Sequence, residues 1–244
     1  MAKANKGKDR REVVEQLRRE QQRAEKKRTT LIVGAAAVVG LVIVGAGAYP
    51  LLSDPQRELA KSDLAALGVS ADAASCTDVV AEKAEGNNDH REPGTKIEYS
   101  SSPPAAGPHY PDWAPMARKF YSADDRPALE QLVHNLEHGY NILWYDDTIA
   151  EDEEKLAQVE AIANKFPGNE YENKFIAAPW TAEDGDPFPD GAHIALTHWS
   201  MGGTNGNPEG QHGITQYCAE PSGEAVAAFV EDYPYTDAPE PGAS

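Results

Sequence analysis

The sequence predicts an α+β protein, in which a single-pass transmembrane helix is followed by one extracytoplasmic domain with a mixed sheet of about four strands and packed helices. Three observations support this prediction: an uncharged apolar run near the N-terminus, an alternation of strand-like and helix-like segments after it, and two cysteines far apart in the chain. The chain has 244 residues, which is enough for one domain of ordinary size with accessory segments.

Charged residues are divided unevenly along the chain. Residues 1–30 contain 11 basic and 5 acidic side chains, whereas the chain from Ser53 onward contains 11 basic and 35 acidic ones. The acidic part would repel a phosphate backbone, which excludes nucleic acid as its partner. Residues 1–28 are predicted to form a basic cytoplasmic arm at the surface of an anionic lipid bilayer.

Residues 29–52 are predicted to be the transmembrane anchor. The run from Leu31 to Tyr49 carries no charged residue and would extend about 28 Å as a helix, close to the ~30 Å of bilayer hydrocarbon. A buried helix of a soluble protein is the alternative, but this run has no polar face. The basic cluster at residues 26–28 places the N-terminus in the cytoplasm and the domain outside the cell membrane.

A cleaved signal peptide is a second interpretation of the apolar run. Ala46 and Ala48 are small residues spaced as a signal peptidase requires, so that the anchor could be cleaved after Ala48. The charged segment before the run is longer than the leader of a signal peptide, and the run exceeds its usual apolar length. An uncleaved anchor is therefore favoured.

The two cysteines are predicted to form a disulfide. Cys76 lies near the start of the external region and Cys218 near its end. An even number of cysteines in an oxidising compartment is typical of a disulfide. The alternative is a pair of free thiols, which would require a cytoplasmic domain or cysteines too far apart to join.

The region after the anchor is predicted to begin with a stalk helix and to end with a flexible tail. Leucines at helical spacing before Gly68 favour a stalk helix over residues 53–75. The extracytoplasmic α+β domain then covers residues 76–231. Residues 232–244 contain three prolines and no residues typical of a core, so that they predict the tail.

Apolar patterns and helix-capping residues predict the elements of the domain. Asp125 is a suitable N-cap and Gly139 a suitable stop for the first helix. Beside a short element around 77–84, strands are expected at 95–99, 140–145, 173–178 and 192–199. Helices are expected at 125–138, 151–166 and 222–230.

Histidines are the residues with the clearest chemical role, and all seven follow the predicted anchor. His134 and His138 are spaced i, i+4, so that on a helix both rings can reach one metal ion. Helical phase places them opposite the leucines of the same helix, on a face that the core does not cover. The proline-rich segment 102–111 presents His109 and could cover this face, or His109 could point into water.

Two motifs resemble a known family. They are Ser102-Pro-Pro-Ala-Ala-Gly-Pro-His-Tyr-Pro111 and Leu132-Val-His-Asn-Leu-Glu-His-Gly139. Over residues 85–200 the chain is similar to bacterial, actinobacterial-type membrane proteins of domain-of-unknown-function family 3105. That family pairs a Pro-Pro-x-x-Gly-x-His loop with a Val-His-x-Leu-Glu-His-Gly helix end, and often has a histidine where His90 stands.

This sequence differs from the family pattern at two places. Ala105 and Ala106 stand where Thr-Ser is usual, and His198 stands where alanine is usual, so that His198 is not expected as a shared ligand. The resemblance implies an anchored external domain with these motif positions, and it implies no reaction.

The predicted function is binding of a transition metal ion, with copper preferred and zinc as the second choice, because imidazole nitrogens suit both ions. Glu137 would orient a ligand or act as a fifth one. The predicted ligands are His90, His109, His134 and His138.

Two alternatives remain open. The motif His134-x-x-Glu137-His138 matches a zinc hydrolase in which Glu137 activates water, but Gly139 ends the helix and no further ligand is evident, so that an enzyme is less favoured. The other alternative is a noncatalytic module that binds an unidentified envelope protein through an acidic, aromatic surface, for which Trp113, Trp180 and Trp199 are available.

Overall fold

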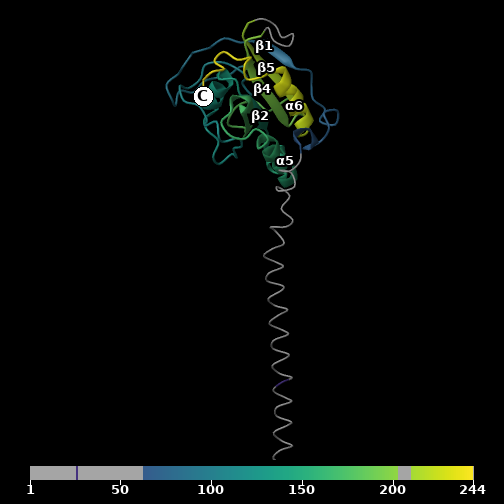
Figure 1. Ribbon diagram of the computed structural model, residues 1–244. Coiled ribbons are helices and arrows are strands. Elements are labelled where there is room, and N and C mark those ends of the chain that lie inside the picture. The colour runs from purple at the N-terminus through teal and green to yellow at the C-terminus, as the bar shows by residue number, and fades with distance from the viewer. Residues whose placement is uncertain (1–25, 27–62, 203–209, 244) are drawn as a thin grey trace, which may run out of the picture. The chain divides into compact units, whose positions relative to one another are not determined.

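The computed structural model describes Lys26, residues 63–202 and residues 210–243 (Figure 1). The predicted anchor at 29–52, residues 53–62 of the predicted stalk and the rest of the basic arm lie outside the described residues. None of the helices that are described has the length and apolar character needed to cross a bilayer. The chain divides into two units, Met1–Asp54 and Pro55–Ser244, and the elements below belong to the second.

A five-stranded mixed sheet forms the centre of the domain. The strand order is β1-β5-β4-β2-β3; β2 and β3 are parallel, and every other neighbouring pair is antiparallel. The predicted α+β class with a mixed sheet is confirmed, with five strands in place of about four. The strands are β1 (Val80–Lys83), β2 (Asn141–Tyr145), β3 (Phe175–Pro179), β4 (Ile194–Ser200) and β5 (His212–Cys218).

Two strands differ from the sequence prediction. Residues 95–99 form no strand and instead contact the proline-rich loop: the Tyr110 hydroxyl donates to the Thr95 carbonyl at 2.9 Å, and the Tyr99 hydroxyl donates to the Pro108 carbonyl at 2.7 Å. The sheet contains instead a strand that the sequence did not predict, β5, which pairs with both β1 and β4. The sequence did not indicate β5, because Gly213 and the polar Gln216 interrupt its apolar pattern.

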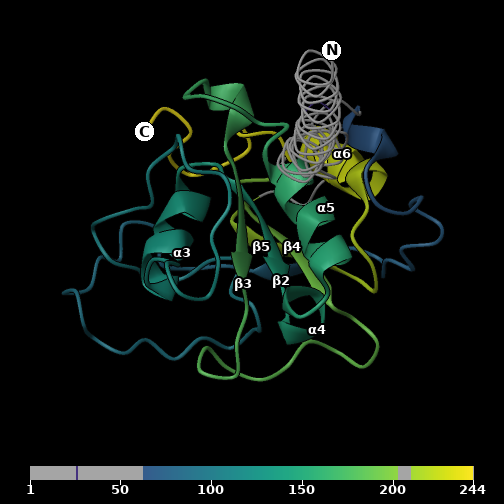
Figure 2. The same cartoon turned by 90° about the horizontal axis from the view of Figure 1, so that it is seen from below.

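Helices cover both faces of the sheet (Figure 2). In that view α3 lies on one side of the sheet, and α4, α5 and α6 lie on the other. Side-chain caps fix two helix starts: Asp152 accepts the backbone N–H of Lys155 in α5, and Ser222 accepts that of Ala225 in α6. The helices are η1 (Leu64–Ala66), α3 (Leu129–Glu137), α4 (Asp147–Ala150), α5 (Glu153–Ala163), η2 (Tyr171–Asn173) and α6 (Gly223–Asp232).

The alternation of side chains along β2 divides the core into two layers. Leu143 and Tyr145 pack in the layer that contains α5 and α6, whereas Ile142 and Trp144 pack in the layer that contains α3. All four side chains are almost completely buried, and each such burial contributes roughly 1.5–3 kcal/mol. Because β2 lies inside the sheet, between β4 and β3, and directly follows α3 in the chain, the end of α3 is firmly positioned.

The predicted stalk helix is wrong over the residues that are described. Leu64–Ala66 is a single 3-10 turn, and Leu67 is 1% exposed in the core. Gly68 has φ +72°, and a Cβ there would lie 2.1 Å from the Pro221 carbonyl oxygen. This segment therefore packs against the start of α6 as a part of the domain.

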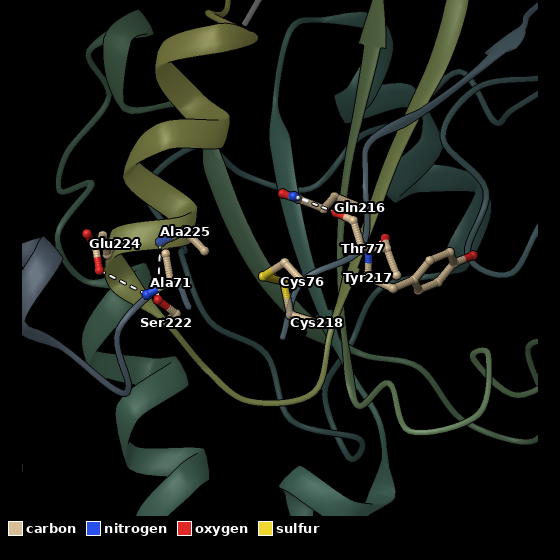
Figure 3. The surroundings of a disulfide bond; sticks show 9 residues. All are labelled: Ala71, Cys76, Thr77, Gln216, Tyr217, Cys218, Ser222, Glu224 and Ala225. Carbon is tan, nitrogen blue, oxygen red and sulfur yellow. Dashed lines mark hydrogen bonds between the residues drawn. A yellow bond between two sulfur atoms is a disulfide. The ribbon is translucent and has the colours of Figure 1, made fainter. Parts of the chain in front are cut away.

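The predicted disulfide between Cys76 and Cys218 is confirmed (Figure 3). It joins the segment before β1 to the last residue of β5, across a sequence separation of 142 residues. Beside it, the Thr77 N–H donates to the Tyr217 carbonyl at 2.8 Å. The bond therefore fastens the start of the domain to its central sheet.

The predicted flexible tail at 232–244 is wrong, because its described residues pack on the domain. Asp237 is 2% exposed, and its carboxylate accepts the Ser200 hydroxyl at 2.6 Å. The buried Lys174 ammonium donates to the Ala243 carbonyl at 2.6 Å. The tail is held by polar and backbone contacts, which its composition does not reveal.

Gly139 ends α3 with φ +91°, and a Cβ there would lie 2.3 Å from the Tyr235 carbonyl oxygen of the tail. The variant Gly139→Ala is expected to lower the free energy of unfolding by roughly 2–3 kcal/mol, because it adds backbone strain and a clash. Urea denaturation measures this change. Gly94→Ala is the matched control, because Gly94 has φ +89° and no heavy atom within 4 Å of such a Cβ. Equal losses in both variants would contradict a role of the tail contact.

Candidate metal centre

Two loop segments are joined in a short parallel ladder beside α3. The His109 N–H donates to the Asp89 carbonyl at 3.1 Å, and the Arg91 N–H donates to the His109 carbonyl at 2.7 Å. This ladder pairs His90 with His109. Two histidines that are distant in sequence thus lie side by side, with ring centroids 5.0 Å apart.

The proline-rich loop covers the face of α3 that carries its histidine, which is one of the two alternatives that the sequence left open. The Nδ1 of His134 lies 2.5 Å from the Tyr110 carbonyl oxygen. At the next residue, the Asn135 side chain accepts the Ala114 N–H at 2.8 Å and donates to the Ala114 carbonyl at 3.0 Å. The loop is therefore bound to the helix by buried hydrogen bonds, and His134 is only 3% exposed.

Two groups of ligand atoms lie at the end of α3, and within each group the atoms are within 4.8 Å of one another. The first group, in which only the His90 side chain is exposed, consists of His90, His109, His134 and Glu137. The second group, which shares Glu137, consists of Glu137, His138 and Glu240.

The structure thus brings four of the five predicted ligands into one group and places the fifth, His138, in the neighbouring group. Glu240 was not predicted, because it belongs to the tail that the sequence indicated as flexible. Glu240 lies about 100 residues after the histidine motif, and no sequence pattern marks it as a metal ligand.

His109 and Glu137 each have one buried atom without a hydrogen-bond partner among the described residues. The His109 Nδ1 lies 2.8 Å from the Gly107 carbonyl oxygen, which can only accept, so that Nδ1 carries a proton. The His109 Nε2 lies 3.0 Å from Glu137 Oε2, but in the neutral ring this nitrogen carries no proton to donate, and neither atom has another partner among the described residues. Both side chains are 0% exposed, and an ion bound to both atoms would satisfy them.

His134 has the same arrangement as His109. Its Nδ1 donates to the Tyr110 carbonyl, which leaves the Nε2 lone pair available for an ion. Metal-ligating histidines commonly donate their second ring N–H to a carbonyl or carboxylate in this way. The His134 Nε2 also lies 2.9 Å from the His138 Nε2, and the His138 Nδ1 has no partner among the described residues.

Burial favours the protonation states that a metal ion requires. Burial lowers the pKa of His134. Burial and the neighbouring His134 ring together lower the pKa of His138 to about 4. Burial alone would raise the pKa of Glu137, but the His109 ring and the Asn88 N–H outweigh it and lower that pKa. At neutral pH the two rings are therefore neutral and Glu137 is a carboxylate.

Acid is expected to destabilise the metal-free protein through His138. The folded-state pKa of about 4 lies below the ordinary value of 6.5, so that the unfolded chain binds more protons between these pH values. The free energy of unfolding is expected to fall by roughly 2 kcal/mol between pH 7 and pH 5. Urea denaturation in a chelator measures this decrease. The His138→Gln variant lacks the titrating ring, and an equally large decrease in that variant would contradict this explanation.

The remaining sequence candidates lie outside both groups. His198 is fully buried, and its two ring nitrogens face the carbonyls of Tyr140 and Asp237, so that it has no nitrogen available for an ion. Of the tryptophans considered for an aromatic surface, Trp180 and Trp199 are buried in the core. Trp113 is 39% exposed, and its ring centroid lies 5.1 Å from that of His134.

The geometry differs from that of the hydrolase motif. In such an enzyme both histidines hold one ion, and the glutamate faces a water molecule. Here His134 and His138 belong to different groups, and Glu137 contributes an atom to each group. Its other carboxylate oxygen is occupied, because Oε1 accepts the Asn88 N–H at 2.6 Å.

The comparisons with known proteins identify one family. The sequence model of the family described as "Protein of unknown function (DUF3105)" matches residues 90–244. No curated protein and no solved structure matches the chain. The family match begins at His90, includes both histidine motifs, and extends through the tail that carries Glu240, beyond the expected end at residue 200. Because the match covers more than half of the sequence, the chain belongs to the DUF3105 family.

Proposed function

We propose that this protein binds one transition-metal ion between His90, His109, His134 and Glu137, with copper(II) as the first choice and zinc as the second. The observation that carries the proposal is the buried pair His109 Nε2 and Glu137 Oε2, which lie 3.0 Å apart without a hydrogen bond. Two ligands of one ion at ~2.0–2.1 Å would have this separation at an angle of about 90°.

The donor set supports the choice of ion. Three imidazoles and one carboxylate are ligands of intermediate to hard character, which suit copper(II) and zinc better than copper(I). At a given site of this kind, copper(II) binds more tightly than zinc. Met116 packs in the core and Met201 is exposed, so that neither side chain argues for a soft copper(I) site.

Four protein ligands favour binding over catalysis. Four side chains fill the coordination positions of a tetrahedral zinc ion or the equatorial positions of a copper(II) ion, whereas catalytic zinc sites keep one position for an activated water molecule. The protein would therefore hold or transfer its ion, and no reaction needs to be assigned to Glu137.

We place this site on the outer side of a bacterial cell membrane as part of the same proposal. The apolar segment 29–52 would anchor the chain in the lipid bilayer, and the basic residues before it would remain in the cytoplasm. A disulfide is typical of an oxidising compartment. An envelope protein that accepts or delivers the ion would be the expected partner.

Copper titration of the metal-free, full-length chain tests the proposal, with tryptophan fluorescence as the readout. Trp113 lies close to His134 and His138, with ring centroids 5.1 Å and 4.9 Å away, so that bound copper(II) is expected to quench its emission. The expected result is quenching that saturates at stoichiometric copper and reverses with a chelator. The Trp113→Phe variant should lose part of this signal, because the Trp199 ring also lies near the site, 6.0 Å from that of His109, and it should still retain copper through gel filtration. Absence of saturable quenching together with loss of copper on the column would contradict the proposal.

A further inference from the structure

The second ligand group, Glu137, His138 and Glu240, lies next to the first group and shares Glu137 with it. His138 is 3% exposed, and its Nδ1 has no hydrogen-bond partner among the described residues. Its Nε2 lies 2.9 Å from the His134 Nε2 and 3.9 Å from Glu240 Oε2. The ring is therefore buried between a ligand of the first ion and a carboxylate.

An ion in the first group would change the surroundings of His138. Once the His134 Nε2 lone pair binds this ion, it can no longer accept a proton from the His138 Nε2. His138 would then be buried with neither nitrogen satisfied, which is unfavourable. A second cation between His138 and the nearby carboxylates would restore a partner to the ring.

Contacts of the tail hold Glu240 close to His138, where its carboxylate could bind the second cation. The Glu240 N–H donates to the Glu137 carbonyl at 2.9 Å. The buried Lys174 ammonium donates both to the His138 carbonyl at 2.7 Å and to the Ala243 carbonyl at 2.6 Å. These contacts hold the backbone on either side of Glu240 against the end of α3, whereas its side chain remains 36% exposed.

We propose that Glu137, His138 and Glu240 bind a second divalent cation next to the first, with Glu137 shared between the two ions. This inference rests on the proposed function, because its first ion occupies the first group. A shared carboxylate commonly joins ions about 3.5–4 Å apart. With three protein ligands, the second position keeps an open coordination site, and its exposed ligand makes it the one that exchanges ions with solvent.

Zinc stoichiometry of the full-length chain tests the inference, because zinc is redox-inactive and can be counted by elemental analysis after equilibrium dialysis. Wild type is expected to bind two zinc ions per chain, and Glu240→Gln is expected to bind one. Glu183→Gln is the matched control, because Glu183 is an exposed acidic residue outside both ligand groups and should leave two ions bound. Circular dichroism would verify that each variant is folded.

The outcomes separate the two proposals. One zinc ion in wild type would overturn the second site and leave the proposed function intact, and no zinc or copper in wild type would overturn the proposed function itself. Two ions in both wild type and Glu240→Gln would also overturn the inference, because Glu240 would then not be a ligand. A loss of one ion in the control as well would overturn the assignment to Glu240.

Discussion

The His134→Ala variant is expected to bind copper(II) at least about 100-fold more weakly than wild type. Loss of a residue that only orients a ligand commonly weakens metal binding by about 10–100-fold, and His134 is proposed as a direct ligand. Its Nδ1 is held by the Tyr110 carbonyl, so that its Nε2 is pre-oriented towards His109 and Glu137. His109 cannot move into this position, because its ring is held by its own contact with the Gly107 carbonyl.

A competition titration against a copper chelator measures this change. His212→Ala is the matched control, because the His212 ring contacts the Gly210 carbonyl and belongs to neither ligand group. His134→Gln is a second variant that keeps a polar side chain near Tyr110, in case the alanine variant does not fold. Wild-type affinity in a folded His134 variant would show that His134 is not a ligand.

Loss of the disulfide is expected to be the most destabilising change in the domain. Replacing Cys218 by serine should lower the free energy of unfolding by about 2–5 kcal/mol, because the bond closes a long loop and restricts the unfolded chain. The two cysteines are 142 residues apart, and Cys218 is also 2% exposed in the core beside α6. The start of the domain would thus lose its covalent link to β5.

Urea denaturation with and without a reductant measures this effect. Reduction of wild type should lower its stability by about as much as Cys218→Ser does. The double variant Cys76→Ser, Cys218→Ser is the control, and a reductant should leave its stability unchanged. Equal stability of reduced and oxidised wild type would contradict the expected role of the bond.

Strands β2, β3 and β4 could be predicted because each contains a run of apolar residues. β2, β3 and β4 are buried along their whole length, and the sequence predicted all three to within a few residues. The start of α3 was predicted too early, at Asp125. That carboxylate instead accepts the Ser122 N–H at 2.9 Å and pairs with Arg118, so that it stabilises a turn before the helix.

The sequence indicated five of the six residues in the two ligand groups, and it missed Glu240. The i, i+4 spacing indicated His134 and His138, but spacing alone cannot show that their neighbours divide them between two ligand groups. Glu240 could not be predicted, because backbone hydrogen bonds and the buried Lys174 hold the tail in place. Such contacts depend on the fold and have no signature in composition.

The most direct test of the metal centre is a crystal of the copper-loaded protein measured on both sides of the copper absorption edge. An anomalous difference peak is predicted among the ring nitrogens of His90, His109 and His134 and the Glu137 carboxylate. A copper peak elsewhere on the chain, or no copper peak in a crystal grown with excess copper, would contradict the account.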